Sequence, residues 1–330
     1  MFKTFLTTLN PMLMLFTCIT IGYLIKKAGI LSDGADKVIA KLETYVFLPA
    51  MNFITLAKYC TVDNLSTNFI NVIFASLATL LAIGISLSLS GFFVKEKSME
   101  KGVYKYALAF ANSGYVGNPL VKGIYNDAVL SYYTIYCLPV SVGIYTWGLG
   151  TMIPGSESKL AKLKKIFNPP IIGLLSGIFF GLSGLGAYIP AFATETLESL
   201  KACMGPCAML LAGITVASFK FKDIVSDKKV YIAPLHRLIF IPTVIVCALF
   251  GIKELLNIVF DLSIDNNILH LCFFSVAAPL GLNTVVFPSA YGGNPKTGAS
   301  MTIISHTLCV ITIPLMYALL TLVFGAASWI

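Results

Sequence analysis

Two short stretches decide how this sequence is read: ANSGYVGNP at residues 111–119 and APLGLNTVVFP at residues 278–288. Each lies inside a long apolar segment, one in each half of the chain, and each combines glycine with proline. Proline removes a backbone donor and clashes with the preceding helical turn, so each stretch predicts a break in a helix. A matched pair of breaks, one in each half, is typical of secondary transporters, in which broken helices form a substrate site near the middle of the membrane.

The composition is that of a protein with little mass outside a membrane. Hydrophobic residues make up 57% of the 330 residues and charged residues 12%, whereas soluble domains contain about 25% charged residues. We therefore expect an all-α integral membrane protein in contact with membrane lipid. The net charge of +8 comes from lysines in short loops. That pattern is typical of cytoplasmic loops, so we expect no nucleic-acid partner.

Apolar runs of about 20 residues, long enough to cross a bilayer as a helix, recur along the chain. They predict ten transmembrane helices, over residues 5–25, 36–57, 67–94, 102–125, 128–152, 170–187, 194–218, 230–251, 267–291 and 297–324. Of the 23 lysines and arginines, 18 lie in or beside the connections that follow spans one, three, five, seven and nine. Because cytoplasmic loops carry the excess of positive charge, we expect both termini outside, in a multi-pass protein of the plasma or inner membrane.

The two halves of the chain repeat a pattern of asparagine and proline. Corresponding positions are Asn10-Pro11 with Asn168-Pro169, Pro49 with Pro206, Asn112 with Asn283, Pro119 with Pro288, and Pro139 with Pro314. Five helices per repeat is an odd number, so the second copy must be inverted in the membrane. The predicted organisation is a five-helix repeat over residues 1–153, a cytoplasmic linker over 154–167 and an inverted five-helix repeat over 168–330, with helices 4 and 9 broken.

The two broken helices carry the candidate substrate-binding residues, and none of these is charged. They are Asn112, Ser113, Gly114, Asn118 and Pro119 in the first stretch and Asn283, Thr284 and Pro288 in the second. Amides and hydroxyls can coordinate an ion or hydrogen-bond a carboxylate without burying a charge of their own. Helix N-termini after the breaks would also present N–H groups to an anion. The alternative is an ordinary proline kink in each helix, with asparagines holding neighbouring helices together.

Four further residues are secondary candidates for the cavity: Asn52, Lys122, His270 and His306. Lys122 either offers a positive charge to an anion in the outer cavity or anchors its helix by reaching to the membrane surface. Each histidine is either a hydrogen-bonded packing residue or a proton-linked or substrate-contacting group. Arg237 is the only arginine and opens the eighth span, where it either anchors the helix at the cytoplasmic surface or guides substrate.

The sequence lacks the signals of enzyme chemistry, so we expect no catalytic residue, no metal site and no bound cofactor. It has no phosphate-binding loop, and its three scattered histidines form no metal-ligand pattern. Acidic residues are absent from the middle of every predicted span, and Glu43, near the cytoplasmic end of the second, is the deepest. A relay of buried carboxylates is therefore not indicated. Coupling to Na⁺ or to H⁺ stays open.

Five motifs follow one another along the chain: YVFLPAMNF at 45–53, NSGYVGNP at 112–119, NPPIIG at 168–173, AAPLGLNT at 277–284 and YGGNP at 291–295. Together they resemble the auxin efflux carrier family, within the bile acid symporter-like superfamily. The resemblance implies spans 1, 2, 6 and 7 as a scaffold and spans 3–5 and 8–10 as a moving transport domain. It also implies that spans four and nine cross near the midplane, where Asn112, Pro119, Asn283 and Pro288 would hold an organic anion.

Residues and resemblance together predict a secondary transporter, or permease, of a small organic anion such as malate, malonate or an auxin-like acid. We expect alternating access, by an elevator-like or rocking motion around the crossing helices. One alternative is a sodium-coupled symporter of organic anions, and another is a membrane sensor derived from a transporter. The acidic cavity residue of some relatives has no clear counterpart in this sequence. A homodimer is left open.

Overall fold

A computed structural model describes residues 2–95, 98–152, 167–220, 222 and 226–329. Apart from its last position, the predicted linker at 154–167 lies outside these residues. The described chain is helical, without a β-strand, as predicted. Its elements are α1 (Phe2–Lys27), α2 (Ala35–Leu42), η1 (Glu43–Phe47), α3 (Leu48–Tyr59), α4 (Val62–Thr67), α5 (Phe69–Phe93), α6 (Met99–Ala109), η2 (Ser113–Gly117), α7 (Asn118–Ile124), α8 (Asp127–Tyr136), α9 (Leu138–Gly143), η3 (Ile144–Gly148), α10 (Leu149–Met152), α12 (Pro169–Leu182), η4 (Leu185–Tyr188), α13 (Ala191–Ala217), α15 (Lys229–Leu235), η5 (His236–Phe240), α16 (Ile241–Phe260), α17 (Asn267–Val276), α18 (Asn283–Tyr291) and α19 (Lys296–Phe324).

Helix occupies part of every stretch that the sequence predicts as a span, but only some of these helices are long and continuous. By length and composition, four described helices could cross a membrane: Phe69–Phe93, Ala191–Ala217, Lys229–Phe260 and Lys296–Phe324. A fifth results if Asp127–Tyr136 and Leu138–Met152, which bend by 44°, count as one span. Other predicted spans are short or divided, as in α12 with 14 residues and α17 with 10. Fewer than ten described helices are long enough to cross a membrane because the helices are interrupted, not because helix is missing from the predicted spans.

The two decisive stretches interrupt their helices and meet each other. One break separates α6 from η2 at residues 110–112, and the other separates α17 from α18 at residues 277–282. Ala111 and Leu280 form an isolated antiparallel bridge. Across it, the Asn112 N–H donates to the Pro279 carbonyl at 2.7 Å, and the Gly281 N–H donates to the Phe110 carbonyl at 3.2 Å. Backbone groups freed by one break are thus satisfied by the other, as an apolar surrounding demands.

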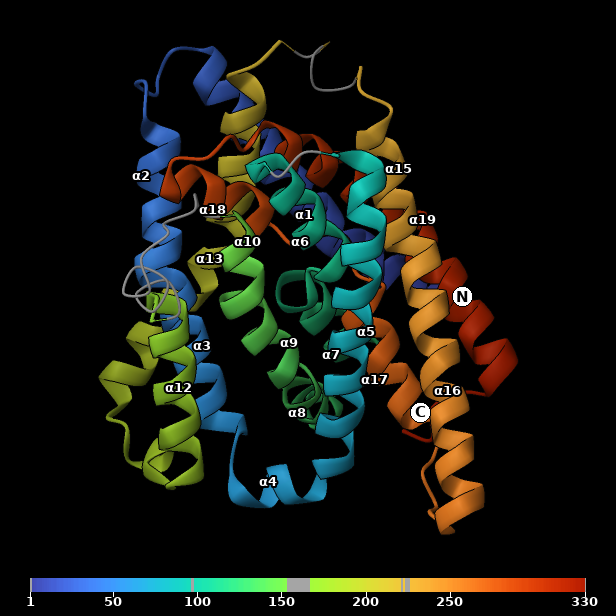
Figure 1. The fold of residues 1–330 in the computed structure, drawn as a ribbon. Coiled ribbons are helices and arrows are strands. Elements are labelled where there is room, and N and C mark those ends of the chain that lie inside the picture. The colour runs from blue at the N-terminus through green and yellow to red at the C-terminus, as the bar shows by residue number, and fades with distance from the viewer. Residues whose placement is uncertain (1, 96–97, 153–166, 221, 223–225, 330) are drawn as a thin grey trace.

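Glycine allows two helix pairs to pack backbone against backbone. A Cβ atom at Gly177 or Gly181 of α12 would meet backbone atoms of α3, and Figure 1 shows these two helices side by side. A Cβ atom at Gly22 or Gly213 would likewise clash at the contact between α1 and α13. Small residues at helix interfaces are how helices approach closely where no hydrophobic force drives them together.

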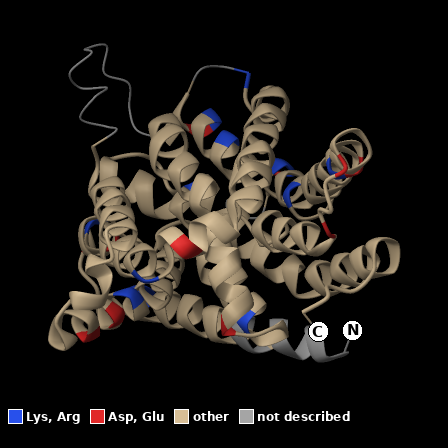
Figure 2. Cartoon of the chain, turned by 90° about the horizontal axis from the view of Figure 1, so that it is seen from below, with Lys and Arg blue, Asp and Glu red and all other residues tan. Residues whose placement is uncertain are grey.

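Large apolar side chains face outward along the helices. Leu80 is 65% exposed, Phe92 69% and Ile258 80%. Seen from below, charged residues are few and the ribbon is mostly free of them (Figure 2). An apolar surface spread over several helices suits lipid rather than water.

Candidate functional site

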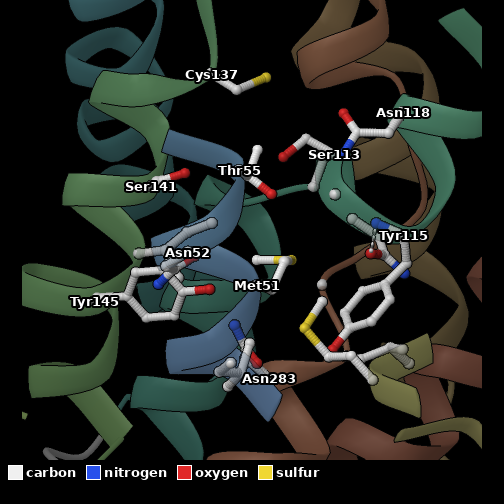
Figure 3. A pocket seen from close by; sticks show the side chains of 18 of the residues that line it. Met51, Asn52, Thr55, Ser113, Tyr115, Asn118, Cys137, Ser141, Tyr145 and Asn283 are labelled. Atoms are coloured by element: carbon white, nitrogen blue, oxygen red, sulfur yellow. Dashed lines mark hydrogen bonds between the residues drawn. The ribbon is translucent and has the colours of Figure 1, made fainter. Parts of the chain in front are cut away.

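A cavity of about 80 Å³ lies beside the meeting point of the two breaks (Figure 3). Space of this size holds several water molecules or a small solute. The polar residues at its wall are Asn52, Thr55, Tyr106, Asn112, Ser113, Tyr115, Asn118, Thr134, Ser141, Tyr145 and Asn283, and Gly114, Cys137, Met51 and Met204 are among the others. Asn112, Ser113, Gly114, Asn118 and Asn283 of the predicted site, together with Asn52, therefore line one space.

The Asn112 side chain is held on both sides. Its Oδ1 accepts from the Tyr115 N–H at 3.2 Å, which caps η2, and its Nδ2 lies 3.3 Å from His306 Nε2. His306 Nδ1 lies 2.8 Å from the Thr302 carbonyl. A carbonyl can only accept, so Nδ1 carries the proton and Nε2 accepts from Asn112. His306 is fully buried and does not line the cavity. In this arrangement it positions Asn112.

Asn283 brings a second amide to the cavity, at the first residue of α18. Its Nδ2 donates to the Tyr106 hydroxyl oxygen at 2.9 Å, which leaves the Tyr106 O–H hydrogen free to donate elsewhere. Asn283 Oδ1 is buried and has no hydrogen-bond partner among the described residues. A buried amide oxygen without a partner is costly, so this atom favours water or a solute in the cavity.

The two helix starts differ in what they offer to an anion. Ser113 and Gly114 open η2 at the cavity wall, where the first N–H groups of a helical segment have no acceptor within it. At the start of α18, the Thr284 N–H bonds the Gly281 carbonyl at 3.1 Å, and the Val285 N–H bonds the Leu282 carbonyl at 2.9 Å. Among the described residues, the first N–H groups of η2 therefore stand at the cavity wall without an acceptor, whereas those of Thr284 and Val285 are bonded within their own loop.

Several predicted site residues lie away from the cavity. Pro119 follows η2 in the first turn of α7, and Pro288 lies inside α18 rather than at its break, where Pro279 is found instead. Thr284 donates its hydroxyl to the Gly281 carbonyl of its own loop at 2.9 Å. Lys122 is exposed and forms an ion pair with Asp127 at 2.9 Å.

His270 also serves a different part of the fold. Its Nδ1 lies 3.2 Å from the Tyr125 hydroxyl, and its Nε2 lies 3.2 Å from the Gly325 carbonyl. These contacts tie α17 to the chain after α7 and to the chain after α19. The geometry is that of a hydrogen-bonded packing residue.

Asn52 and Tyr145 form the wall opposite the breaks (Figure 3). Asn52 Nδ2 donates to the Pro170 carbonyl at 2.9 Å, which joins α3 to the start of α12. The NPPIIG motif begins with Asn168, whose Nδ2 donates to the Tyr145 carbonyl at 2.8 Å and whose Oδ1 caps α12. Both asparagines therefore fix the position of this wall.

Sequence reasoning missed the tyrosines of the cavity and its hydroxyl residues other than Ser113. Tyr115 stands inside the quoted stretch, and Thr55 lies one helical turn after Asn52. Ser141 follows Pro139, one of the matched prolines. Their places beside motifs already singled out are a sequence signal that could have identified these three residues. Tyr106 had none, because its place opposite Asn283 depends on how the two broken segments meet.

Arg237 is an interior residue and not the expected surface anchor. Its side chain is 1% exposed, and Nη1 donates to the Leu108 carbonyl at 3.3 Å. Nε and Nη2 have no hydrogen-bond partner among the described residues. The guanidinium interacts electrostatically with Tyr106, which lines the cavity. A positive charge is therefore buried one residue behind the cavity wall.

Comparison with known proteins places this chain in a family. The model of a family described as "Membrane transport protein" matches residues 7–317. An uncharacterized transporter of Methanocaldococcus jannaschii is 26% identical over 315 residues, which cover 93% of this chain and 97% of that protein. An uncharacterized transporter of Methanothermobacter thermautotrophicus is 22% identical over 242 residues, which cover 70% of this chain and 77% of that protein.

The family match and the Methanocaldococcus relative extend over nearly the whole chain, and they agree with the resemblance that the five sequence motifs indicate. The family is one of membrane transporters and not a class of enzymes. The chain therefore belongs to the membrane transport protein family, the family of the auxin efflux carriers.

Proposed function

We propose that this protein is a secondary carrier of a small organic anion, such as malonate, malate or an auxin-like acid, that works by alternating access. The observation that carries the proposal is the cavity at the meeting point of the two breaks, because residues from both halves of the chain form its wall. Asn52 and Met204 at this wall belong to the predicted scaffold, and Asn112 and Asn283 belong to the predicted transport domain. Movement of one against the other can therefore open the cavity to either side.

Charge favours an anion as the solute. Within the described part of the chain, no charged side chain lines the cavity, so a cation would meet no carboxylate at its wall. The Tyr106 hydroxyl and the first N–H groups of η2 can donate to a carboxylate. Arg237 adds a positive charge behind Tyr106. These groups together stabilise negative charge in the cavity.

Helix packing supports the proposed ten-span inverted repeat over residues 1–153 and 168–330. The two most extensive helix contacts are α1 with α13 and α3 with α12, which correspond to spans one with seven and two with six. Span one corresponds to span six and span two to span seven. If each span is replaced by its counterpart in the other repeat, one pair therefore becomes the other. This relationship also fits a scaffold of spans 1, 2, 6 and 7. We propose both termini on the outside of the plasma or inner membrane.

Thermal unfolding of the purified protein tests the choice of substrate, because a ligand that binds only the folded state raises the melting temperature. Malonate, malate and indole acetate are compared with the amides of the same skeletons. We expect at least one acid to stabilise the protein and its amide to do so much less. Equal stabilisation by acid and amide would contradict an anion site.

Flux through liposomes that contain the purified protein separates the proposal from its alternatives. A carrier moves the stabilising anion across the membrane, whereas a sensor binds it without flux. Dependence of that flux on Na⁺ would identify the sodium-coupled symporter.

A further inference from the structure

One acidic side chain is buried behind the cavity, contrary to what its place near the end of a predicted span indicated. Glu43 is 0% exposed and opens η1, a π-helical turn between α2 and α3. Turns of this kind are frequent at functional sites. Neither carboxyl oxygen has a hydrogen bond, and no lysine or arginine lies within 4.0 Å, among the described residues. The mechanism proposed above does not use this group.

Tyr115 connects Glu43 to the cavity. The Tyr115 hydroxyl and the Ala208 backbone are the polar groups beside the carboxyl, although neither reaches hydrogen-bonding geometry. The Tyr115 hydroxyl is itself buried without a hydrogen-bond partner among the described residues. Tyr115 also lines the cavity, as Figure 3 shows. The Glu43 carboxyl and the Tyr115 hydroxyl, both without hydrogen bonds in the described chain, are therefore neighbours, and the Tyr115 side chain separates the carboxyl from the cavity.

The other groups that face Glu43 are neutral. Tyr145 of η3 and Cys207 of α13 interact with it. The packed helix α12 has no titratable side chain, and Tyr291 of α18 pairs with Tyr45. Lys41, on the same helical segment, is exposed. No neighbour in the described chain offers the positive charge that an ionised Glu43 would need.

This environment links the charge of Glu43 to the content of the cavity. A buried carboxylate without a partner is strongly disfavoured, so the neutral acid suits this buried position. An anion in the cavity adds a second negative charge nearby, and two like charges in such surroundings disfavour each other. When the anion leaves and water fills the cavity, the carboxyl can lose its proton to that water.

We infer that Glu43 is the proton-carrying group of this carrier, so that each organic anion crosses together with one proton. The inference rests on the proposed function. On release, the O–H bond of the Glu43 carboxylic acid breaks and its proton passes to the Tyr115 oxygen, while the Tyr115 hydroxyl proton passes to a cavity water. Glu43 is left as a carboxylate, Tyr115 as a neutral phenol and the water as hydronium. Uptake of the next anion reverses these steps.

The test uses liposomes containing the full-length protein, labelled malonate or malate, a pH dye inside, and a membrane potential held at zero. An inward proton gradient of about one pH unit should drive up to about tenfold accumulation by wild type, because one proton moves with each anion. Glu43→Gln imitates the neutral acid. It should keep exchange of labelled for unlabelled anion but lose proton movement and accumulation. Glu198→Gln, an acid paired with Lys201 on the surface of α13, is the matched control and should behave as wild type.

The possible outcomes distinguish failure of the Glu43 inference from failure of the carrier proposal. Exchange without proton movement in wild type, or gradient-driven accumulation that survives in Glu43→Gln, would overturn the inference and leave the carrier proposal intact. Protonation of the substrate itself changes with pH in wild type and variant alike, so it cannot imitate the difference between them. Absence of any carboxylate exchange in wild type would overturn the proposed function, and the inference with it.

If Glu43→Gln fails to fold, Tyr115→Phe supplies the second test. It removes the hydroxyl between Glu43 and the cavity and keeps the ring. Because Tyr115 also lines the cavity, the readout is the number of protons moved per anion exchanged, which should fall at least about tenfold, as for loss of a positioned proton-transfer group. An unchanged number of protons per anion in Tyr115→Phe would contradict the proposed route.

Discussion

The backbone N–H of Asn112 donates to the carbonyl of Pro279 at 2.7 Å, across a sequence separation that spans the two halves of the chain. With the reciprocal bond from Gly281 to Phe110, it joins the two broken segments at one point. Asn112 and Gly281 both line the cavity, so a movement of the joined segments displaces the cavity wall.

Asn283→Ala should weaken anion binding more than it weakens the fold. The substitution removes the donor to Tyr106 and the free Oδ1 at the cavity. Loss of a hydrogen-bond partner in a buried site costs about 1–3 kcal/mol, or roughly 5- to 150-fold in affinity. Titration of the stabilising acid by thermal shift measures it. Asn71→Ala, which removes a donor to Asn68 outside this cavity, should leave the affinity unchanged.

His306→Ala should act through Asn112. Without the imidazole, the Asn112 Nδ2 loses its acceptor, and we expect a loss of about 1–3 kcal/mol in stability. His306→Gln, whose amide oxygen can accept from Asn112, should recover part of it. Melting temperatures of both variants give the comparison, with His236→Ala, a partly exposed histidine of η5, as control. Equal losses in the Ala and Gln variants would count against the positioning role.

Arg237→Met should lower anion affinity without loss of fold. In general, two unit charges about 10 Å apart interact by roughly 1–2 kcal/mol at an effective dielectric constant near 20. Replacement of a buried charge by an apolar side chain of similar length is often neutral or stabilising. Arg237→Lys keeps the charge and should retain most of the affinity. If Met and Lys bind the acid equally well, the charge of Arg237 has no part in binding.

Gly177→Ala should destabilise the contact between α12 and α3. A Cβ atom at Gly177 would lie 2.7 Å from the Phe53 carbonyl oxygen, so the helices must move apart, at a cost of about 1–3 kcal/mol. Gly84→Ala in α5 has open space around the new Cβ and provides the control. Its melting temperature should equal or exceed that of wild type, since alanine favours helix.

The sequence was most informative where polar residues stand beside the glycines and prolines that break a helix. Asn112, Gly114 and Asn283 were recognisable because they stand beside glycine and proline in the two stretches, and they line the cavity. Pro288 was misleading, since a helix buried in protein can contain proline when neighbouring groups satisfy the freed carbonyl. Here α18 continues past Pro288 to Tyr291.

Tertiary packing determines which residues near the span ends are buried, and the sequence alone does not show this. Glu43 and Arg237 both read as residues near span ends, yet both are buried. Neighbouring segments, such as η2 and α13 around Glu43, come from distant parts of the chain. Hydropathy along one helix carries no information about such neighbours. Tyr106 was missed for the same reason.

Counterflow in liposomes tests the central claim most directly. Vesicles containing the purified protein are loaded with unlabelled malonate, malate or indole acetate, and uptake of the same labelled acid from outside is followed over time. The account predicts a transient overshoot of label for at least one acid, abolished when its amide replaces the acid inside. If a folded protein shows no overshoot with any acid, or if the amide drives it equally well, the claim that this protein carries an organic anion is contradicted.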